Sequence, residues 1–254
     1  MLTSCDETHS KTNAGREKRP RRCVMSDVRT VSLESAASVA EWAQFLAAVL
    51  TDTIPATCDV IGVFAQNDLQ LEILDVVVGL ARRFARQPQI LINGLDRYEP
   101  TERSWGCGAW LRFLIGNYGV RPEQVTVLPE ARHTGQEAEE IIRFSARHGW
   151  KTITIVATPY RMPRCFLTTL GVMRAQGLAL KIFCRSISAI DWGGRAEKHS
   201  VIAGSVVGTR FDQLAVELEK IVEYREKFVK GVPDSSPIAS IEEGLQHLRA
   251  RSEQ

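Results

Sequence analysis

Two arginines stand close together where an apolar stretch of the chain turns polar. The stretch is "IVATPYRMPRCF" (155–166), and Arg161 and Arg164 lie three residues apart within it. The step from apolar residues to Thr158 and Pro159 predicts a strand followed by a helix, with Thr158 as N-cap and Pro159 in the first turn. Arginines three apart share one face of a helix. Together with Tyr160 and the free amides of the helix N-terminus, they would suit a phosphate or carboxylate.

A second polar segment, "PEARHTGQE" (129–137), contains groups that could move protons. Glu130, His133 and Glu137 are the candidate acids and bases. Thr134 and Gln136 are candidate ligand-binding residues beside them. Each has a structural alternative: Thr134 and Glu137 match a capping box, His133 is a lone loop histidine, and either glutamate could pair with an arginine at the surface.

Two further loops follow apolar runs. Asn67 and Asp68 come after the first run, where they would orient a ligand or simply cap the next helix. Asn93 and Gly94 come after the second run, where they would line a site or only form a turn. The sequence contains none of the common phosphate-binding, nucleophile-elbow or metalloprotease motifs, and we predict no metal site.

These polar groups belong to a regular alternation of predicted strands and helices. Apolar, β-branched runs predict strands, and helical spacing of apolar residues predicts the helices between them. The strands are expected at 58–65, 88–94, 123–130, 151–158 and 178–186, and the helices at 31–49, 69–85, 106–119, 134–149, 159–177 and 211–229. Alternation of this kind predicts an α/β fold, a three-layer, doubly wound, mostly parallel sheet of about five strands (Rossmann-like) with N- and C-terminal helices. The candidate residues then lie at the carboxyl ends of the strands, where such folds bind ligands.

The same alternation of predicted strands and helices defines the domain organisation. Residues 1–30 are expected to be a disordered basic tail, residues 31–230 one Rossmann-like domain, and residues 231–254 a C-terminal tail with a short helix. The long helix at 211–229 has a polar face that we expect to be solvated; its residues are Glu217, Glu219, Lys220, Glu223 and Arg225.

Charge and composition limit the function classes. The 254 residues carry a net charge of +2, and residues 1–25 alone hold six basic and three acidic side chains. The rest of the chain is therefore slightly acidic, so we expect no specific nucleic-acid binding. No long apolar run or signal peptide is present, which predicts a cytoplasmic protein with no membrane span. Its six cysteines are expected to be reduced, with Cys107 and Cys165 either packing residues or reactive thiols.

Five segments between residues 58 and 190 resemble a known family. The segments are "VIGVFAQND", "ILINGLD", "GVRPEQVTVLPE", "HTGQEAEE" and "IVATPYRMPRCF". In this order they resemble the YdcF/SanA/ElyC-like family, a bacterial domain of unknown function, of which this chain looks like a divergent member. The resemblance implies a Rossmann-like domain with one polar cleft, a link to cell-envelope processes, and S-adenosylmethionine or a nucleotide as a possible cofactor. By position, the cleft would be lined by Asn93, Gly94, Glu130, Thr134, Gln136, Arg161 and Arg164.

The chain departs from the family pattern at several of these positions. Asn93-Gly94-Leu95 replaces Ser-Gly-Gly, His133 replaces an asparagine, and Arg161 replaces the histidine of "YHM". The last change removes a base and adds a cation.

The sequence leaves three functions open. The first is an enzyme, a hydrolase or transferase, acting on a small anionic molecule held by the two arginines. The second is a non-catalytic sensor that binds such a molecule. The third is association with RNA or a membrane through residues 11–22, which predicts strongly salt-dependent binding. The oligomeric state is not indicated.

Overall fold

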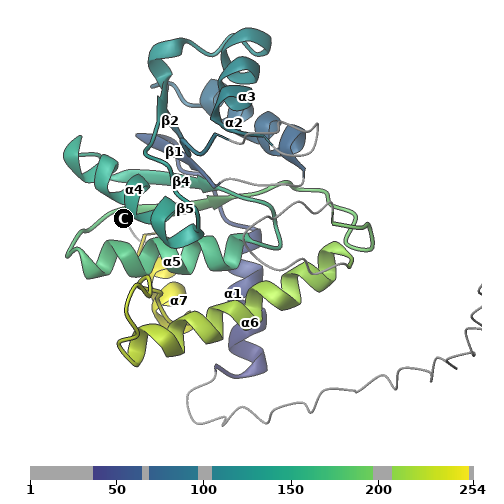
Figure 1. The fold of residues 1–254 in the computed structure, drawn as a ribbon, viewed down its shortest axis with the longest axis vertical. Helices are drawn as coiled ribbons and strands as arrows, with labels where there is room; N and C mark the ends of the chain where they lie inside the picture. Colours follow the sequence, from purple (N-terminus) through teal and green to yellow (C-terminus); the bar gives the residue numbers. More distant parts are fainter. Residues whose placement is uncertain (1–36, 65–68, 97–104, 197–207, 252–254) are drawn as a thin grey trace, which may run out of the picture. The chain divides into compact units, whose positions relative to one another are not determined.

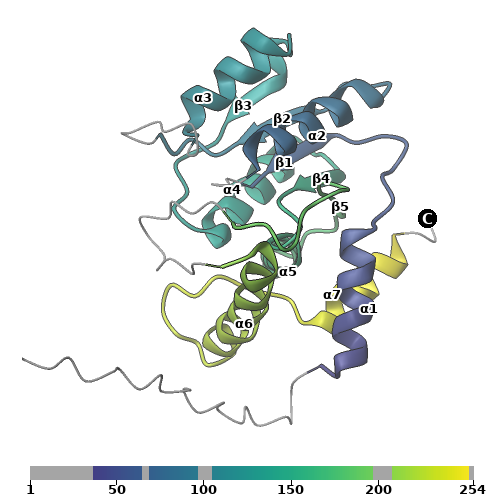
Figure 2. The ribbon, with the colours of Figure 1, turned by 90° about the vertical axis from the view of Figure 1, so that its right-hand side faces the viewer.

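Five parallel strands form the centre of the part of the protein that the structure describes. The computed structural model describes residues 37–64, 69–96, 105–196 and 208–251. The strands are β1 (Val60–Val63), β2 (Gln89–Ile92), β3 (Val125–Val127), β4 (Thr152–Val156) and β5 (Lys181–Arg185). They lie in the order β3-β2-β1-β4-β5, with β3 labelled in Figure 2 and the other strands in Figure 1. All four pairings are parallel. The prediction of a doubly wound, parallel α/β fold is therefore confirmed.

Helices cover both faces of this sheet. The helices are α1 (Val39–Leu50), α2 (Gln70–Arg83), α3 (Cys107–Leu111), α4 (Thr134–Arg147), α5 (Met162–Ala175), α6 (Arg210–Val229) and α7 (Ile241–Ala250). One apolar cluster joins α2 and α3 to Ile61 and Ile90, and another joins α1, α4, α5 and α7 to Val60 and Leu91. Neighbouring residues of a strand point to opposite faces, so the two clusters are the two cores of a three-layer fold (Figure 2).

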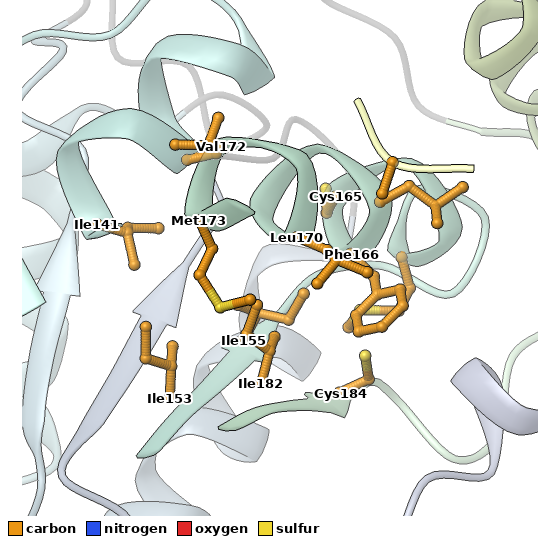
Figure 3. Packing of buried hydrophobic residues seen from close by; sticks show 14 of the residues in the cluster. Ile141, Ile153, Ile155, Cys165, Phe166, Leu170, Val172, Met173, Ile182 and Cys184 are labelled. Atoms are coloured by element: carbon orange, nitrogen blue, oxygen red, sulfur yellow. The ribbon is translucent and has the colours of Figure 1, made fainter. Parts of the chain in front are cut away.

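Helix α5 is the most enclosed helix of the fold. Every residue from Met162 to Met173 is buried. Figure 3 shows Phe166, Leu170 and Met173 packed above Ile155 and Ile182 of the sheet. Because nearly every side of α5 is covered, Arg164 in its first turn is enclosed with the apolar residues.

The helix boundaries differ from the predicted ones at several points. Helix α1 begins after Ser38, which forms a capping box with Glu41, rather than at residue 31. The predicted helix at 106–119 is α3 continued by a π-helix over Arg112–Asn117. The predicted N-terminal tail (residues 1–30), with its basic segment, and the pair Asn67–Asp68 lie outside the described residues.

The chain after α6 returns to the core. The short helix expected in residues 231–254 is α7, which packs beside α1 and α5. Just before α7 the backbone crosses α5 closely, and the Ala239 amide donates to the Leu167 carbonyl at 3.0 Å. A Cβ on Gly171 would lie 2.7 Å from the Ile238 backbone, so glycine permits this crossing.

Strand β5 is an edge strand whose outer backbone groups bond to side chains. The Ile182 amide donates to His247 Nε2 at 3.2 Å, and the Cys184 amide donates to Asp52 Oδ2 at 2.7 Å. Arg251 donates to the Ile182 carbonyl and also pairs with Asp52. Side chains from α7 and from the end of α1 therefore replace the missing neighbouring strand.

No helix among the described residues is long and apolar enough to cross a membrane.

Candidate functional site

The strand order reverses between β1 and β4. Strand β1 pairs with β2 on one side and with β4 on the other, and Val63 aligns with Val156 at their carboxyl ends. Connections from these two strands leave in opposite directions, which opens space for a ligand in folds of this type. The segment from Thr158 to Arg164 follows β4 directly at this point.

The helix after β4 begins later than predicted. The Thr158 carbonyl accepts hydrogen bonds from the amides of Arg161 and Met162 at 3.0 and 2.9 Å, which forms a turn. Helix α5 starts at Met162, with Arg161 in the N-cap position and Pro163 in the first turn. The prediction of Thr158 as N-cap and Pro159 as opening residue is therefore wrong. Thr158 is instead fully buried.

Thr134 joins the two arginines. Its hydroxyl accepts from Arg161 Nη2 at 3.2 Å and from Arg164 Nη1 at 2.5 Å. It lies inside α4, whose N-cap is His133; His133 Nδ1 accepts from the Gln136 amide at 3.4 Å. The Thr134–Glu137 capping box, which was the structural alternative for these residues, does not form, because Thr134 is the first residue of α4 and His133 is the N-cap.

Arg164 forms a buried ion pair with Glu217 of α6. The two side chains are each 7% exposed, and Arg164 Nε donates to the Glu217 carboxylate. The second oxygen of Glu217 pairs with Lys220 at 3.1 Å. Burial by itself raises the pKa of Glu217, but the charges of Arg164 and Arg161 outweigh it and the pKa lies below its ordinary value. The carboxylate that pairs with Arg164 is therefore neither Glu130 nor Glu137, the two that the sequence suggested.

The expectation that Glu217 lies on a solvated face is wrong. It is one of three buried residues of α6, with Leu214 and Ile221. These positions are three and four residues apart, so they form one stripe along the helix. The signal for a buried glutamate was its place on this apolar stripe, on which an unpaired charge would be costly.

Asn93 holds the carboxyl ends of β2 and β3 together. Its side-chain amide donates to the Ala131 carbonyl at 2.7 Å and to Glu137 Oε1 at 3.1 Å. Its side-chain oxygen accepts from the amides of Leu95 and Ala131 at 2.9 and 3.0 Å. A Cβ on Gly94 would lie 2.2 Å from the Leu128 carbonyl oxygen, so only glycine allows this approach.

Two small hollows lie on either side of Asn93. The space that the centre of a water molecule can occupy is about 10 Å³ in the larger hollow and about 0 Å³ in the smaller, so each holds about one water molecule at most. Both are lined by Val63 and Asn93. The larger adds Ile92, Leu95, Trp105, Cys107 and Trp110, and the smaller adds Leu128, Pro129, Ala131, Glu137, Glu140 and Ile141. In the larger hollow Trp105 is fixed by stacking on Phe113, with ring centroids 4.3 Å apart.

The other candidate acids and bases lie away from the hollows. Glu130 is exposed and pairs with Arg132 at 2.9 Å. His133 is exposed, and so is Gln136, whose side chain accepts from the Arg132 amide at 2.8 Å. Of the three candidate catalytic residues, Glu137 alone is buried at this edge of the sheet.

The two cysteines of interest differ in exposure. Cys165 is fully buried, and burial raises the pKa of its thiol to about 12 although Arg161 and Arg164 act to lower it. That thiol is a packing group. Cys107 is partly exposed at the larger hollow, and burial raises its pKa as well. Among the described residues, no three histidine, cysteine or acidic side chains could share a metal ion.

No family model matches this chain, and a search of curated proteins gave no match either. The resemblance to the YdcF-like family therefore stays a prediction.

Proposed function

We propose that this protein binds a small anionic molecule at the carboxyl edge of its sheet, as a divergent YdcF-like protein would. The observation that carries the proposal is the convergence of Arg161 and Arg164 on the hydroxyl of Thr134. Two guanidinium groups brought together beside the reversal of strand order are suited to a phosphate or carboxylate.

Charged groups of both signs gather around the two arginines. Arg161, Arg164, Glu137 and Glu217 lie close enough to act on the Cys165 thiol, and Lys220 pairs with Glu217. An anion bound at this place would be paired by the two guanidinium groups. The larger hollow, lined by Asn93 and Trp105, has room for about one water molecule, so a larger ligand would require this edge of the sheet to open. A nucleotide or S-adenosylmethionine would be a ligand of this larger kind.

A hydrolase or transferase would use Glu137 for proton transfer. This carboxylate lines the smaller hollow and is oriented by Asn93 at 3.1 Å. Glu130 and His133 point to solvent and are less suited to this role. A non-catalytic sensor is the second candidate, and turnover of the bound molecule separates the two.

Thermal unfolding in the presence of anions tests the proposal. The panel consists of sulfate, sugar phosphates, nucleotides and S-adenosylmethionine. A ligand present at about 100 times its Kd adds roughly 2.7 kcal/mol of stability. We expect at least one anion to raise the Tm of the wild type, and Arg161→Ala to lose that shift.

Arg132→Ala is the matched control, because Arg132 is an exposed arginine in the neighbouring loop. It should keep the full shift. The proposal is abandoned if no anion raises the Tm of the wild type, or if Arg161→Ala responds as the wild type does. Arg161 is preferred to Arg164 for this test because loss of Arg164 also breaks a buried ion pair.

A further inference from the structure

The carboxylate of Glu217 already takes the position that a ligand anion would take. One of its oxygens accepts from Arg164, and the other lies 3.1 Å from Lys220 Nζ. The same arginine donates to Thr134, whose hydroxyl also accepts from Arg161. Glu217 is thus an internal anion within the arginine cluster, and it comes from a helix that is distant in sequence from the rest of the site.

Helix α6 buries few side chains, and its polar ties to the C-terminal segment come from Arg225, which pairs with Glu243 and donates to the Ile238 carbonyl. Of its 20 residues only Leu214, Glu217 and Ile221 are buried, and it packs against α5. Its own interactions maintain it as a helix: a capping box joins Thr209 and Asp212, and ion pairs follow along its exposed side. A helix stabilised in this way can shift as a unit without unfolding.

We infer that α6 is a displaceable cover over the anion site and that the ligand's anionic group replaces Glu217. This rests on the proposed function. Withdrawal of Glu217 by itself would leave Arg164 buried and unpaired, which is costly. An incoming phosphate or carboxylate removes that cost, so opening of α6 and binding of the anion are coupled.

Calorimetric titration with inorganic phosphate and with acetate tests this inference on three proteins: the wild type, Glu217→Gln and Glu219→Gln. Glu219 is exposed on the same helix and provides a matched control. Glu217→Gln keeps the shape of the side chain and removes the competing charge. We expect it to bind the preferred anion at least tenfold more tightly than the wild type, and Glu219→Gln to equal the wild type. A larger gain with phosphate indicates a phosphorylated ligand, and a larger gain with acetate indicates a carboxylate.

The outcomes separate the inference from the proposed function. Equal, measurable affinity in the wild type and Glu217→Gln overturns the inference and leaves the proposed function in place. No binding to any of the three proteins overturns both.

Hydrogen exchange on the wild type gives a second measurement that does not depend on how the variant folds. Saturating phosphate or acetate, whichever binds, should speed exchange of the α6 amides while leaving those of α5 unchanged. Unchanged or slower exchange in α6 would show that the helix is not displaced.

Discussion

The described residues include the buried arginine–carboxylate pairs Arg251–Asp52 and Arg164–Glu217, and these are held in different ways. Arg251 and Asp52 meet beside β5, with side chains 4% and 5% exposed. Arg164 and Glu217 meet beside the carboxyl end of β4, with side chains 7% exposed. The chemistry and the burial are nearly the same, so any difference in role must come from the other groups that each pair contacts.

The Arg251–Asp52 pair is joined to strand backbone. Asp52 accepts from the Cys184 amide at 2.7 Å, and Arg251 donates to the Ile182 carbonyl. The guanidinium also lies over the Phe183 ring, 4.3 Å from its centroid. Because these backbone groups belong to an edge strand, the pair completes the hydrogen bonding of the sheet.

Within the described residues, the groups that hydrogen-bond to the side chains of Arg164 and Glu217 are all side chains. Thr134 accepts from Arg164, and Lys220 donates to Glu217. No strand depends on these bonds, and a small anion could reproduce what Glu217 supplies. From this comparison we predict that the Arg251–Asp52 pair is structural and that the Arg164–Glu217 pair can be exchanged for a bound anion.

The largest effect should come from Arg251→Ala. The substitution leaves Asp52 buried without its cation and removes a donor from the Ile182 carbonyl, so we expect a loss of about 3–5 kcal/mol in the free energy of unfolding. Urea denaturation measures it. Arg249→Ala, an exposed change on the same helix, should stay within about 0.5 kcal/mol of the wild type. Similar losses in both variants would refute the structural role of the pair.

The same strand edge should weaken in acid through His247. Burial lowers the pKa of this imidazole to about 4 from 6.5, and the charges of Arg251 and Arg174 act in the same direction. The unfolded chain binds the proton between these values and the folded chain does not. Stability is therefore full above pH 6.5, falls as the pH drops, and by about pH 4 has lost roughly 3 kcal/mol at most.

Urea denaturation at pH 7 and pH 4 of the wild type and His247→Gln checks this effect. Glutamine can still accept from the Ile182 amide but does not titrate in this range. The loss between the two pH values should be smaller in the variant, and an equal loss would exclude His247 as its source.

A smaller loss is expected for Arg164→Ala. The remaining carboxylate of Glu217 can reach water if α6 shifts outward, so we expect a loss of about 1–3 kcal/mol, below that of Arg251→Ala. Urea denaturation of both variants under the same conditions measures the difference. A loss equal to or above that of Arg251→Ala would show that α6 is as firmly held as the strand edge.

The smallest effect should follow from replacing the whole α6 pair with apolar residues. Arg164→Met with Glu217→Leu removes both charges together, and we expect stability within about 1 kcal/mol of the wild type. The matched double change, Arg251→Met with Asp52→Leu, should still lose about 2 kcal/mol or more, because the Cys184 amide and Ile182 carbonyl lose partners. Urea denaturation measures the free energy of unfolding of both double variants. If both change by the same amount, the two pairs do not differ in role.

Local patterns in the sequence determined the architecture. The apolar runs around β1, β2, β4 and β5 indicated strands buried on both faces, and their alternation with helical spacing led to the parallel sheet. The same patterns placed Asn93, Thr134 and Arg161 at the carboxyl edge, because each follows a strand in the chain. These features depend on residues that are a few positions apart in the chain, so the spacing of apolar residues in the sequence is enough to predict them.

Only the tertiary structure decided which groups meet. Arg164 pairs with a glutamate 53 positions away, and Arg251 with an aspartate 199 positions away. Helical spacing places Glu217 on the stripe of Leu214 and Ile221, but only the packing of α6 against α5 shows that its partner is Arg164. Thr134 matched a capping box, but the two arginines took its hydroxyl. Charge pairing across the fold depends on how whole helices pack, and no local spacing of residues carries that information.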